Sequence, residues 1–307
     1  MPEKILDEQG VATIVELSEQ EMLAWRKEFG AIRGREVLPP AEYIDKAVEA
    51  LGGQPYLSAN VVTTTKLILD IRETAWQIYT AHEQLVCGQA MRQLLQNNTE
   101  ARSILSSIIT RDGVAAFTLN DETALMQKIA AVIGEVNGRT FPYIYELAKS
   151  ITQSRRSRAG KAFERIIRHI IDAKGFPCDD QSRTGTAMFA AVGLGKIVDG
   201  LLPSIEGYQQ NRAKCAILTM KTTLRERWQE VVEELERTKV PHIYLLTLDD
   251  AVNDSNLDTM KSHNITLVAP NSVQQANPSK QNLISFERLF NEELPHLLAY
   301  WDQGTNK

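Results

Sequence analysis

Two carboxylates and one lysine are spaced so that they could meet around a divalent cation. Asp199 lies in the short apolar segment 196–202, and Lys221 closes the apolar run 213–220, which has the composition of a buried strand. Glu234 lies on the helix predicted to follow. Acids and a lysine at the ends of neighbouring strands and on the next helix can surround one cation. Oxygen ligands without a His/Cys cluster favour Mg²⁺ over Zn²⁺.

An Arg-Glu-Arg triplet, Arg225-Glu226-Arg227, stands at the predicted start of that helix. Thr222 and Thr223 precede it as typical N-cap residues, and the apolar positions that follow recur at helical spacing. Positive charge near a helix N-terminus is mildly unfavourable, so the two arginines predict compensation by something outside the chain. The alternative is an amphipathic helix with solvated charges, which is the better explanation for any one of these residues taken alone.

The first half of the chain predicts mainly helices. The longest covers about 58–98, and two shorter ones cover 100–109 and 122–136. The apolar positions of the long helix recur at spacings of three and four: Leu67, Ile71, Ala75, Ile78 and Leu85. We therefore expect residues 1–145 to form a mainly helical N-terminal region.

The second half alternates strands and helices. Four short apolar segments predict strands: 196–202, 213–220, 242–248 and 265–270. A final helix is predicted over 283–301. This order is typical of an α/β fold with a mixed central β-sheet flanked by helices, and we expect residues 146–307 to form a catalytic core.

A helix that opens at Pro142 leads into a strongly basic stretch. Arg155, Arg156, Arg158 and Lys161 lie there with few acids among them. Such a helix could contact the phosphates of a polyanion, with an affinity that falls steeply as salt rises. A solvated basic face explains the same composition equally well.

Composition limits the class of protein. The 307 residues carry a formal charge of −5 and are 43% hydrophobic, enough for one large domain or two of modest size. There is no run of eighteen apolar residues and no basic-then-apolar leader, so we expect neither a membrane span nor a signal peptide. The three cysteines form no metal-binding pattern and suit reduced thiols, which predicts a cytoplasmic protein.

The order of the candidate catalytic residues resembles that of the PD-(D/E)xK nucleases. In their usual form an acid precedes the lysine by two residues, but here Thr219 occupies that place. A subgroup of Type II restriction endonucleases, the SsoII/PspGI/EcoRII group that cuts CCNGG-type sites, has its second acid on the following helix. The chain resembles that subgroup through Asp199, Lys221 and Glu234, through the Arg-Glu-Arg triplet, and through Glu164 as an upstream acid.

The resemblance, which covers about 150–248 and more loosely the N-terminal half, implies a Mg²⁺-dependent enzyme that cuts double-stranded DNA at a palindrome with a CC/GG core. Asp199, Glu234 and, as a weaker candidate, Glu164 would hold the metal, and Lys221 would stabilise charge at the scissile phosphate. It also implies cleavage before the CC with 5′ overhangs, a homodimer, and a cognate DNA methyltransferase in a bacterial cytoplasm. Whether the target is CCNGG or an extended site such as TCCNGGA, of the PfoI type, stays open.

The same resemblance implies contacts to DNA bases. Arginine pairs with guanine O6 and N7 and a carboxylate with cytosine N4, so the Arg-Glu-Arg triplet suits adjacent G·C pairs. Gln153 would lie in the minor groove, although an ordinary polar helix residue explains it as well. Arg72 and Trp76, four residues apart on one helix face, would hold a flipped central nucleotide. The alternative for this pair is a core tryptophan beside a surface arginine. We expect the N-terminal region to provide DNA contacts, this base-flip pocket and dimerisation.

Two other functions share parts of this pattern. A DNA repair or junction-resolving nuclease of the same superfamily would need no base-reading triplet and would not cut plasmids into discrete bands. A non-catalytic DNA-binding regulator would keep all of its activity when Asp199 or Lys221 is replaced by alanine. The sequence leaves both alternatives open.

Overall fold

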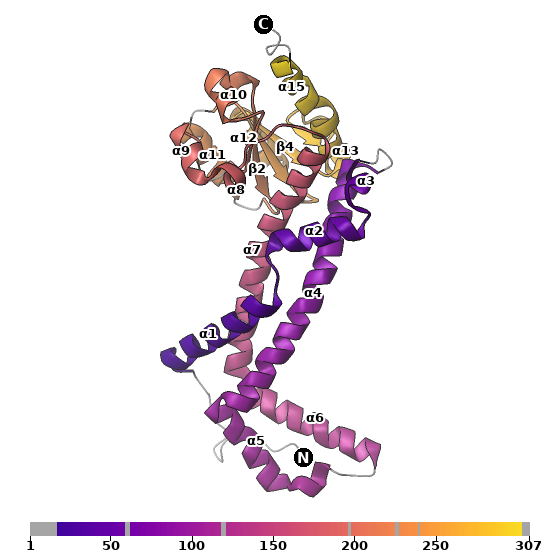
Figure 1. Cartoon of the computed structure of the whole chain (residues 1–307), viewed down its shortest axis with the longest axis vertical. Coiled ribbons are helices and arrows are strands. Elements are labelled where there is room, and N and C mark those ends of the chain that lie inside the picture. The colour runs from indigo at the N-terminus through magenta and orange to yellow at the C-terminus, as the bar shows by residue number, and fades with distance from the viewer. Residues whose placement is uncertain are drawn as a thin grey trace. The chain divides into compact units, whose positions relative to one another are not determined.

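The chain folds into two compact units. The computed structural model describes residues 17–58, 62–117, 121–195, 198–224, 227–238 and 240–302 (Figure 1). Each unit is assembled from two stretches of chain that are far apart in sequence. Unit 1 comprises Met1–Leu38 and Tyr79–Arg156, and unit 2 comprises Pro39–Ile78 and Ser157–Lys307. The boundary predicted between 145 and 146 therefore differs from the structural one, because it falls inside the continuous helix α7 (Phe141–Ala173).

Unit 1 is helical throughout its described residues. It contains α1 (Glu19–Glu36), α5 (Thr99–Asp112), a 3₁₀ turn (Val114–Phe117), α6 (Glu122–Arg139) and the adjoining parts of α4 (Thr64–Asn97) and α7. α1 begins with a capping box between Ser18 and Glu21. In the core of the unit, the indole N–H of Trp25 donates to the backbone carbonyl of Tyr143 at 3.0 Å. The predicted helical character of this part of the chain is confirmed.

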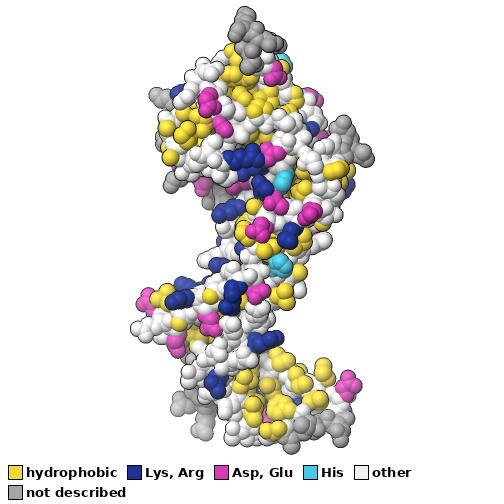
Figure 2. Space-filling model, viewed as in Figure 1, with side chains coloured by type: hydrophobic (Ala, Val, Ile, Leu, Met, Phe, Trp, Pro, Cys, Tyr) yellow, Lys and Arg dark blue, Asp and Glu magenta, His cyan; other side chains and the backbone are white. Residues whose placement is uncertain are grey.

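One face of unit 1 presents large apolar side chains to solvent. Ile109, Val114, Met126 and Ile133 are between 47% and 70% exposed. Figure 2 shows an area of hydrophobic side chains, in yellow, over α5 and α6. Contiguous apolar surface on a folded protein usually marks a place where another surface binds.

Unit 2 is built on a five-stranded mixed sheet. Its strands are β1 (Gly200–Leu202), β2 (Ala216–Lys221), β3 (Ile243–Thr247), β4 (Ile265–Ala269) and β5 (Leu283–Ser285), in that spatial order. β1 is antiparallel to β2, and the other three pairings are parallel. The predicted α/β class with a mixed central sheet is confirmed. The sequence missed β5, because a three-residue strand leading directly into α14 (Phe286–Arg288) reads as the first turn of a helix.

Helices enclose the sheet of unit 2, and Figure 1 shows the strands surrounded by them. The helices and helical turns that have not yet been named are α2 (Pro40–Ala50), α3 (Gly53–Ser58), α8 (Gln181–Thr184), α9 (Thr186–Ala191), α10 (Ile205–Gln210), a 3₁₀ turn (Arg212–Lys214), α11 (Arg227–Thr238), α12 (Asp254–Ser262), α13 (Asn271–Ala276), a π-helical turn (Leu289–Glu293) and α15 (Leu294–Asp302). Val231 of α11 and Leu257 of α12 share one hydrophobic cluster with Ile217 of β2 and Leu245 of β3. Strands covered in this way read as continuous apolar runs, which is why four of them could be predicted.

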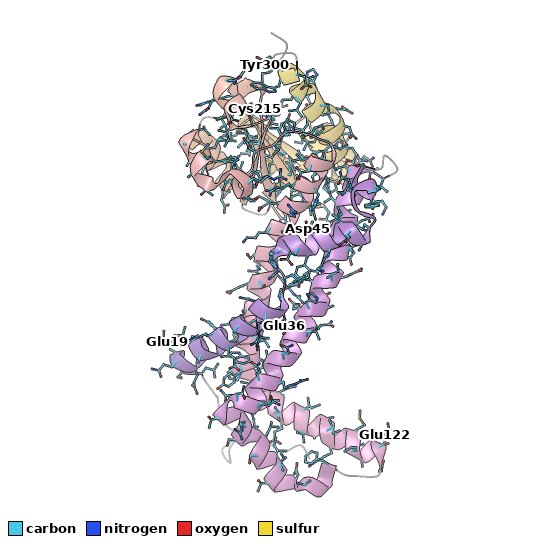
Figure 3. The ribbon with its side chains drawn as sticks, in the orientation of Figure 1. Glu19, Glu36, Asp45, Glu122, Cys215 and Tyr300 are labelled. Carbon is cyan, nitrogen blue, oxygen red and sulfur yellow. The ribbon has the colours of Figure 1, made fainter. Side chains whose placement is uncertain are left out.

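Polar contacts of Asp45 and Thr65 join the separate stretches of unit 2. Asp45 of α2, labelled in Figure 3, accepts from the Arg165 guanidinium of α7 at 2.8 Å and lies 2.7 Å from the His169 ring. The backbone N–H of Thr65, at the start of α4, donates to the carboxylate of Glu287 at 2.8 Å. The N-terminal stretch is thereby fixed to the same body as the sheet.

The long predicted helix is present as α4, but its apolar positions are not all buried. Leu67, Ile71 and Ala75 are buried, whereas Leu85 is 58% exposed. Val86 takes the buried position instead, because the apolar face of a helix with 3.6 residues per turn drifts along a helix of this length. Within the described residues, none of the helices combines the length and hydrophobicity needed to cross a bilayer.

Candidate active site

Asp199 lies immediately before β1, where this strand meets β2. Its backbone N–H donates to the carbonyl of Leu218 at 2.9 Å, and its Oδ2 accepts from the N–H of Met220 at 2.6 Å. Gly200 pairs with Leu218 in the antiparallel register, so Asp199 and Thr219 are the next neighbours across the two strands. The backbone of β2 therefore fixes the Asp199 carboxylate in place.

Lys221 ends β2 and pairs in register with Thr247 of β3. Thr219 and Lys221 are two residues apart on one strand, so their side chains leave the same face. Asp199 and Lys221 thus come from the ends of neighbouring strands, which is the placement that their spacing in the sequence predicts. Their chemical roles stay predictions.

Glu164 of α7 is the third charged group of this site. Burial raises the pKa of the Asp199 carboxyl to about 7, and the negative charge of Glu164 adds to that rise. The Met220 N–H and the positive charge of Lys221 act in the opposite direction. Burial also raises the pKa of Glu164, and again Lys221 opposes the shift. The charges of Asp199, Glu164 and Lys221 therefore influence one another.

The charges of this site are not neutralised by ion pairs with the protein groups that the structure places. Neither Asp199 nor Glu164 forms an ion pair with a described residue. The hydroxyl of Thr219 is buried and has no hydrogen-bond partner among the described side chains and backbone groups. Two carboxylates and an unsatisfied hydroxyl are hard oxygen donors, and their chemistry fits an oxygen-coordinated divalent cation.

A complete metal-ligand set is not visible in the described part of the chain. No three His, Cys, Asp or Glu side chains gather closely enough there to hold an ion. Glu234, the predicted second ligand, belongs to α11, but its side chain lies outside the described residues. Of the predicted ligand set, the structure describes the side chains of Asp199 and Glu164, and the charge of Glu164 acts on Asp199.

The predicted base-reading triplet can be placed only in part. Arg225 and Glu226 lie outside the described residues, and Arg227 begins α11 with a side chain that is also outside them. Thr222 and Thr223 do not directly precede the helix, because α11 begins later than the apolar pattern predicts. The triplet follows closely on Lys221 in the chain, and its contacts stay predictions.

Asp249 is a residue of this region that sequence reasoning missed. Its Oδ2 accepts from the backbone N–H of Leu224 at 2.5 Å, and its own N–H donates to Thr247 Oγ1 at 3.2 Å. These bonds hold the segment after Lys221 against the end of β3. The available signal was an acid just beyond a buried strand, since the ends of adjacent parallel strands share one edge of the sheet.

Two of the four predicted phosphate-contacting residues are engaged within the protein. The guanidinium of Arg155 pairs with the buried carboxylate of Glu83, with Nε 3.0 Å from each carboxylate oxygen. The guanidinium of Arg158 lies over the ring of Tyr43, 5.9 Å from its centroid. The basic stretch lies on the same continuous helix, α7, that the sequence predicts to open at Pro142. Arg155 thus has a protein partner for its charge, and its phosphate contact stays a prediction.

The other predicted contacts on α7 are available at the surface. Gln153, Arg156 and Lys161 are exposed. Gln153 and Arg156 belong to unit 1, whereas Lys161 belongs to unit 2. Exposure is compatible with both the DNA contact and the solvated face that the sequence left open.

Arg72 and Trp76 lie on the surface of α4, within unit 2. Trp76 is 41% exposed, and Arg72, one turn before it, is also exposed. The alternative of a core tryptophan is therefore wrong. Both residues belong to the same unit as the sheet, whereas we expected them in an N-terminal region of residues 1–145.

Comparisons with curated proteins connect the chain to restriction enzymes. The Type II restriction enzyme SsoII of Shigella sonnei is 43% identical over 126 residues, which is 41% of this chain and 41% of that protein. The Type II restriction enzyme EcoRII of Escherichia coli is 28% identical over 135 residues, 43% of this chain and 31% of that protein. The matched segments thus span less than half of the length of these relatives.

Solved structures match over more of the chain. Metal-depleted Ecl18kI in complex with uncleaved DNA superimposes with a TM-score of 0.73 and 26% identity, covering 93% of this chain and 86% of that one. The PspGI–substrate DNA complex shares the fold, with a TM-score of 0.58 and 17% identity over 86% of this chain and 94% of that one. The family model described as EcoRII C terminal matches residues 117–290, more than half of the chain and most of the structure described above. The chain belongs to the EcoRII C terminal family.

Proposed function

We propose that this protein is a Type II restriction endonuclease, which uses a divalent metal ion to cut both strands of DNA at a palindrome with a CC/GG core. The observation that carries the proposal is the placement of Asp199 and Lys221 at the ends of the paired strands β1 and β2, where the charge of Glu164 also acts on Asp199 and no protein cation forms an ion pair with either carboxylate among the described residues. Family membership and the DNA in the related complexes support it.

Asp199 and Glu164, with Glu234 from α11, are the residues that would hold Mg²⁺. The bound ion supplies Lewis acidity and lowers the pKa of a coordinated water. Lys221 lies beside the scissile phosphate, where its ammonium offsets the negative charge that develops on the phosphoryl oxygens and orients the attacking water. The Met220 N–H holds Asp199 Oδ2, so the carboxylate needs little reorganisation when DNA binds.

Sequence selection belongs to the Arg225-Glu226-Arg227 triplet in this proposal. Two arginines and one glutamate match the acceptors and donors of adjacent G·C pairs, and each good contact discriminates by about 1–3 kcal/mol. Replacing Glu226 or Arg227 by alanine should abolish the preference for CC/GG sites in a competition binding assay. Retention of the wild-type preference by either variant would remove the triplet from the proposal. Cleavage falls before the CC, leaving 5′ overhangs, at CCNGG or at an extended site such as TCCNGGA.

The exposed pair Arg72 and Trp76 receives the central nucleotide when it leaves the helix stack. Stacking on an aromatic ring offsets part of the unstacking cost by about 1–3 kcal/mol. A 2-aminopurine at the central position should brighten when the protein binds. Trp76→Ala should change that signal, while Trp76→Phe, which keeps an aromatic face, should change it less. An unaltered signal in both variants would assign the pair to another role.

A palindromic target with two cuts fits a twofold-symmetric homodimer, each subunit reading one half-site. The exposed apolar face over α5 and α6 supports an association of this kind. The enzyme would work in a bacterial cytoplasm beside a DNA methyltransferase that protects the host's own sites. Sedimentation of the protein with and without a duplex would show the stoichiometry.

One experiment tests the activity and separates it from its alternatives. Purified protein and Mg²⁺ are incubated with a plasmid of known sequence, and the cut positions are mapped. Discrete bands with ends at CC/GG palindromes are expected, whereas a repair or junction-resolving nuclease would give no such bands. Asp199→Ala and Lys221→Ala should still bind a CC/GG duplex but fail to cut it, and the exposed surface acid Asp258 offers a matched control, Asp258→Ala, that should cut normally. A regulator would be unaffected by all three changes.

A further inference from the structure

Thr219 carries a buried hydroxyl that no described residue satisfies. Its side chain is fully buried in β2, and its Oγ1 has no hydrogen-bond partner among the groups that the structure describes. Leaving a buried hydroxyl unpaired destabilises a folded protein, and such groups are rare in native structures. The site therefore retains an unfavourable feature that needs a physical reason.

Other fully buried threonines of the chain are satisfied by the protein itself. Thr247, at the end of the neighbouring strand β3, accepts from the N–H of Asp249 at 3.2 Å. Thr140 donates to the carbonyl of Val136 at 2.8 Å. Packing alone thus does not prevent a buried threonine in this protein from finding a partner.

The unsatisfied hydroxyl lies within the candidate active site. Thr219 neighbours Asp199 across the β1–β2 junction, because Asp199 bonds to the backbone of the residues on either side of it, Leu218 and Met220. It also shares a strand face with Lys221. The hydroxyl donates weakly toward the Asp199 carboxylate, which lowers the pKa of Asp199, but this contact falls short of the geometry of a full hydrogen bond.

We infer that Thr219 is a positioning residue of the metal site, whose hydroxyl gains its hydrogen-bond partner among the ligand oxygens when a hydrated divalent cation binds at Asp199. The inference rests on the proposed function. In the metal-loaded protein the Thr219 hydroxyl holds the Asp199 carboxylate, or a water bound to the cation, in one orientation. Outer contacts of this kind commonly change metal affinity by about 10–100-fold.

The inference predicts opposite effects of one substitution on stability and on metal affinity. Thr219→Val keeps the branched shape and removes only the hydroxyl. In EDTA the variant should melt about 1–3 °C higher than the wild type, because the unpaired group is gone. Its affinity for Mn²⁺, measured by electron paramagnetic resonance as loss of the free-ion signal, should fall about tenfold. Thr219→Ser, which keeps the hydroxyl, should stay within about threefold of the wild type.

Two comparators make the test decisive. Thr247→Val removes an equally buried hydroxyl that has a partner, so it should melt lower than the wild type in EDTA. Asp199→Ala removes a proposed ligand and should abolish tight Mn²⁺ binding. If Thr219→Val binds Mn²⁺ like the wild type, or melts lower in EDTA as Thr247→Val does, the inference about Thr219 is overturned while the proposed metal site stands. If the wild type itself binds no Mn²⁺, both the proposed function and the inference fail.

Discussion

Glu83 in unit 1 and Asp199 in unit 2 are two acids with little exposure to solvent and opposite surroundings. The carboxylate of Glu83 accepts from the hydroxyl of Tyr79 at 2.7 Å and from the guanidinium of Arg155, and the hydrogen bond with Glu83 raises the pKa of Arg155. Asp199 has a second acid nearby and no ion-pair partner among the described residues, and its carboxyl has a pKa of about 7. Glu83 therefore has its hydrogen-bond and ion-pair partners within the protein.

The difference separates a structural ion pair from the uncompensated acids of the proposed metal site. The ion pair between Glu83 of α4 and Arg155 of α7 stabilises the contact between these two helices. Two acids that raise a pKa by burial and proximity store unfavourable free energy, which a bound cation can release. The comparison therefore predicts that substitutions around Glu83 affect stability and those around Asp199 affect activity.

Lys221→Met and Arg155→Met should have opposite effects, and this is the largest expected difference. Lys221→Met should reduce the rate of DNA cleavage by about 10³-fold or more, because charge stabilisation and water orientation at the phosphate are lost. Its melting temperature should stay close to that of the wild type. Arg155→Met should lower the melting temperature and leave the rate of the cutting step, measured in single-turnover assays with saturating enzyme, within about tenfold. Equal losses of cutting rate in Lys221→Met and Arg155→Met would contradict this expectation.

Glu83→Gln should lower the free energy of unfolding by about 1–3 kcal/mol, since it removes the charge from a buried, hydrogen-bonded pair. The Arg155 side chain is 46% exposed, so solvent limits the loss. Urea unfolding followed by circular dichroism measures the effect. The double variant Glu83→Gln/Arg155→Met should lose less than the sum of the two single variants, and simple additivity would show that the two side chains are not coupled.

Asp199→Asn should stabilise the metal-free protein. The pKa of Asp199 is raised in the folded state, so at about pH 8 the folded protein keeps a charged group that the unfolded chain solvates better. Removing the charge should raise the free energy of unfolding in EDTA by about 1–3 kcal/mol. Glu83→Gln provides the contrast, because the same chemical change there should destabilise. A loss of stability in Asp199→Asn would mean that the protein itself compensates the Asp199 charge.

His242 is a half-buried titratable side chain whose hydrogen-bond partner, Thr266, is neutral, and a smaller effect on stability is expected there. Its ring lies 2.8 Å from Thr266 Oγ1, and burial lowers its pKa below the ordinary value. The unfolded state then binds more protons, so stability is complete above about pH 6.5 and falls as pH drops through the unfolded pKa. We expect a loss of about 1 kcal/mol or less between pH 7.5 and 5.5 from this group. The pH dependence of urea midpoints should flatten in His242→Phe, and an unchanged slope would contradict the assignment.

The α/β class and the juxtaposition of Asp199 and Lys221 could be predicted because buried strands have a strong local signal. Apolar runs bounded by polar turns identify β2, β3 and β4, and an acid and a lysine at the ends of adjacent strands must then lie near each other. β5 has only three residues and α11 begins later than its apolar pattern, so local periodicity fails at both places.

Long-range partners could not be predicted from the sequence. Glu83 and Arg155 are 72 residues apart, and only the packing of α4 against α7 brings them together. The hydrogen bond of Asp249 to Leu224 depends on the parallel pairing of β2 with β3. The exposure of Leu85 depends on which neighbour covers that turn of α4. Each of these is decided by tertiary packing, about which residue type and spacing carry little information.

Because unit 2 is assembled from two separate stretches of the chain, it cannot be isolated as one continuous fragment. No single truncation frees the body that holds the sheet, since Pro39–Ile78 is part of it. A fragment starting at residue 157 would leave Arg165 and His169 without Asp45, and Glu287 without Thr65. A portable version would instead need its two segments rejoined by a short artificial loop in place of unit 1.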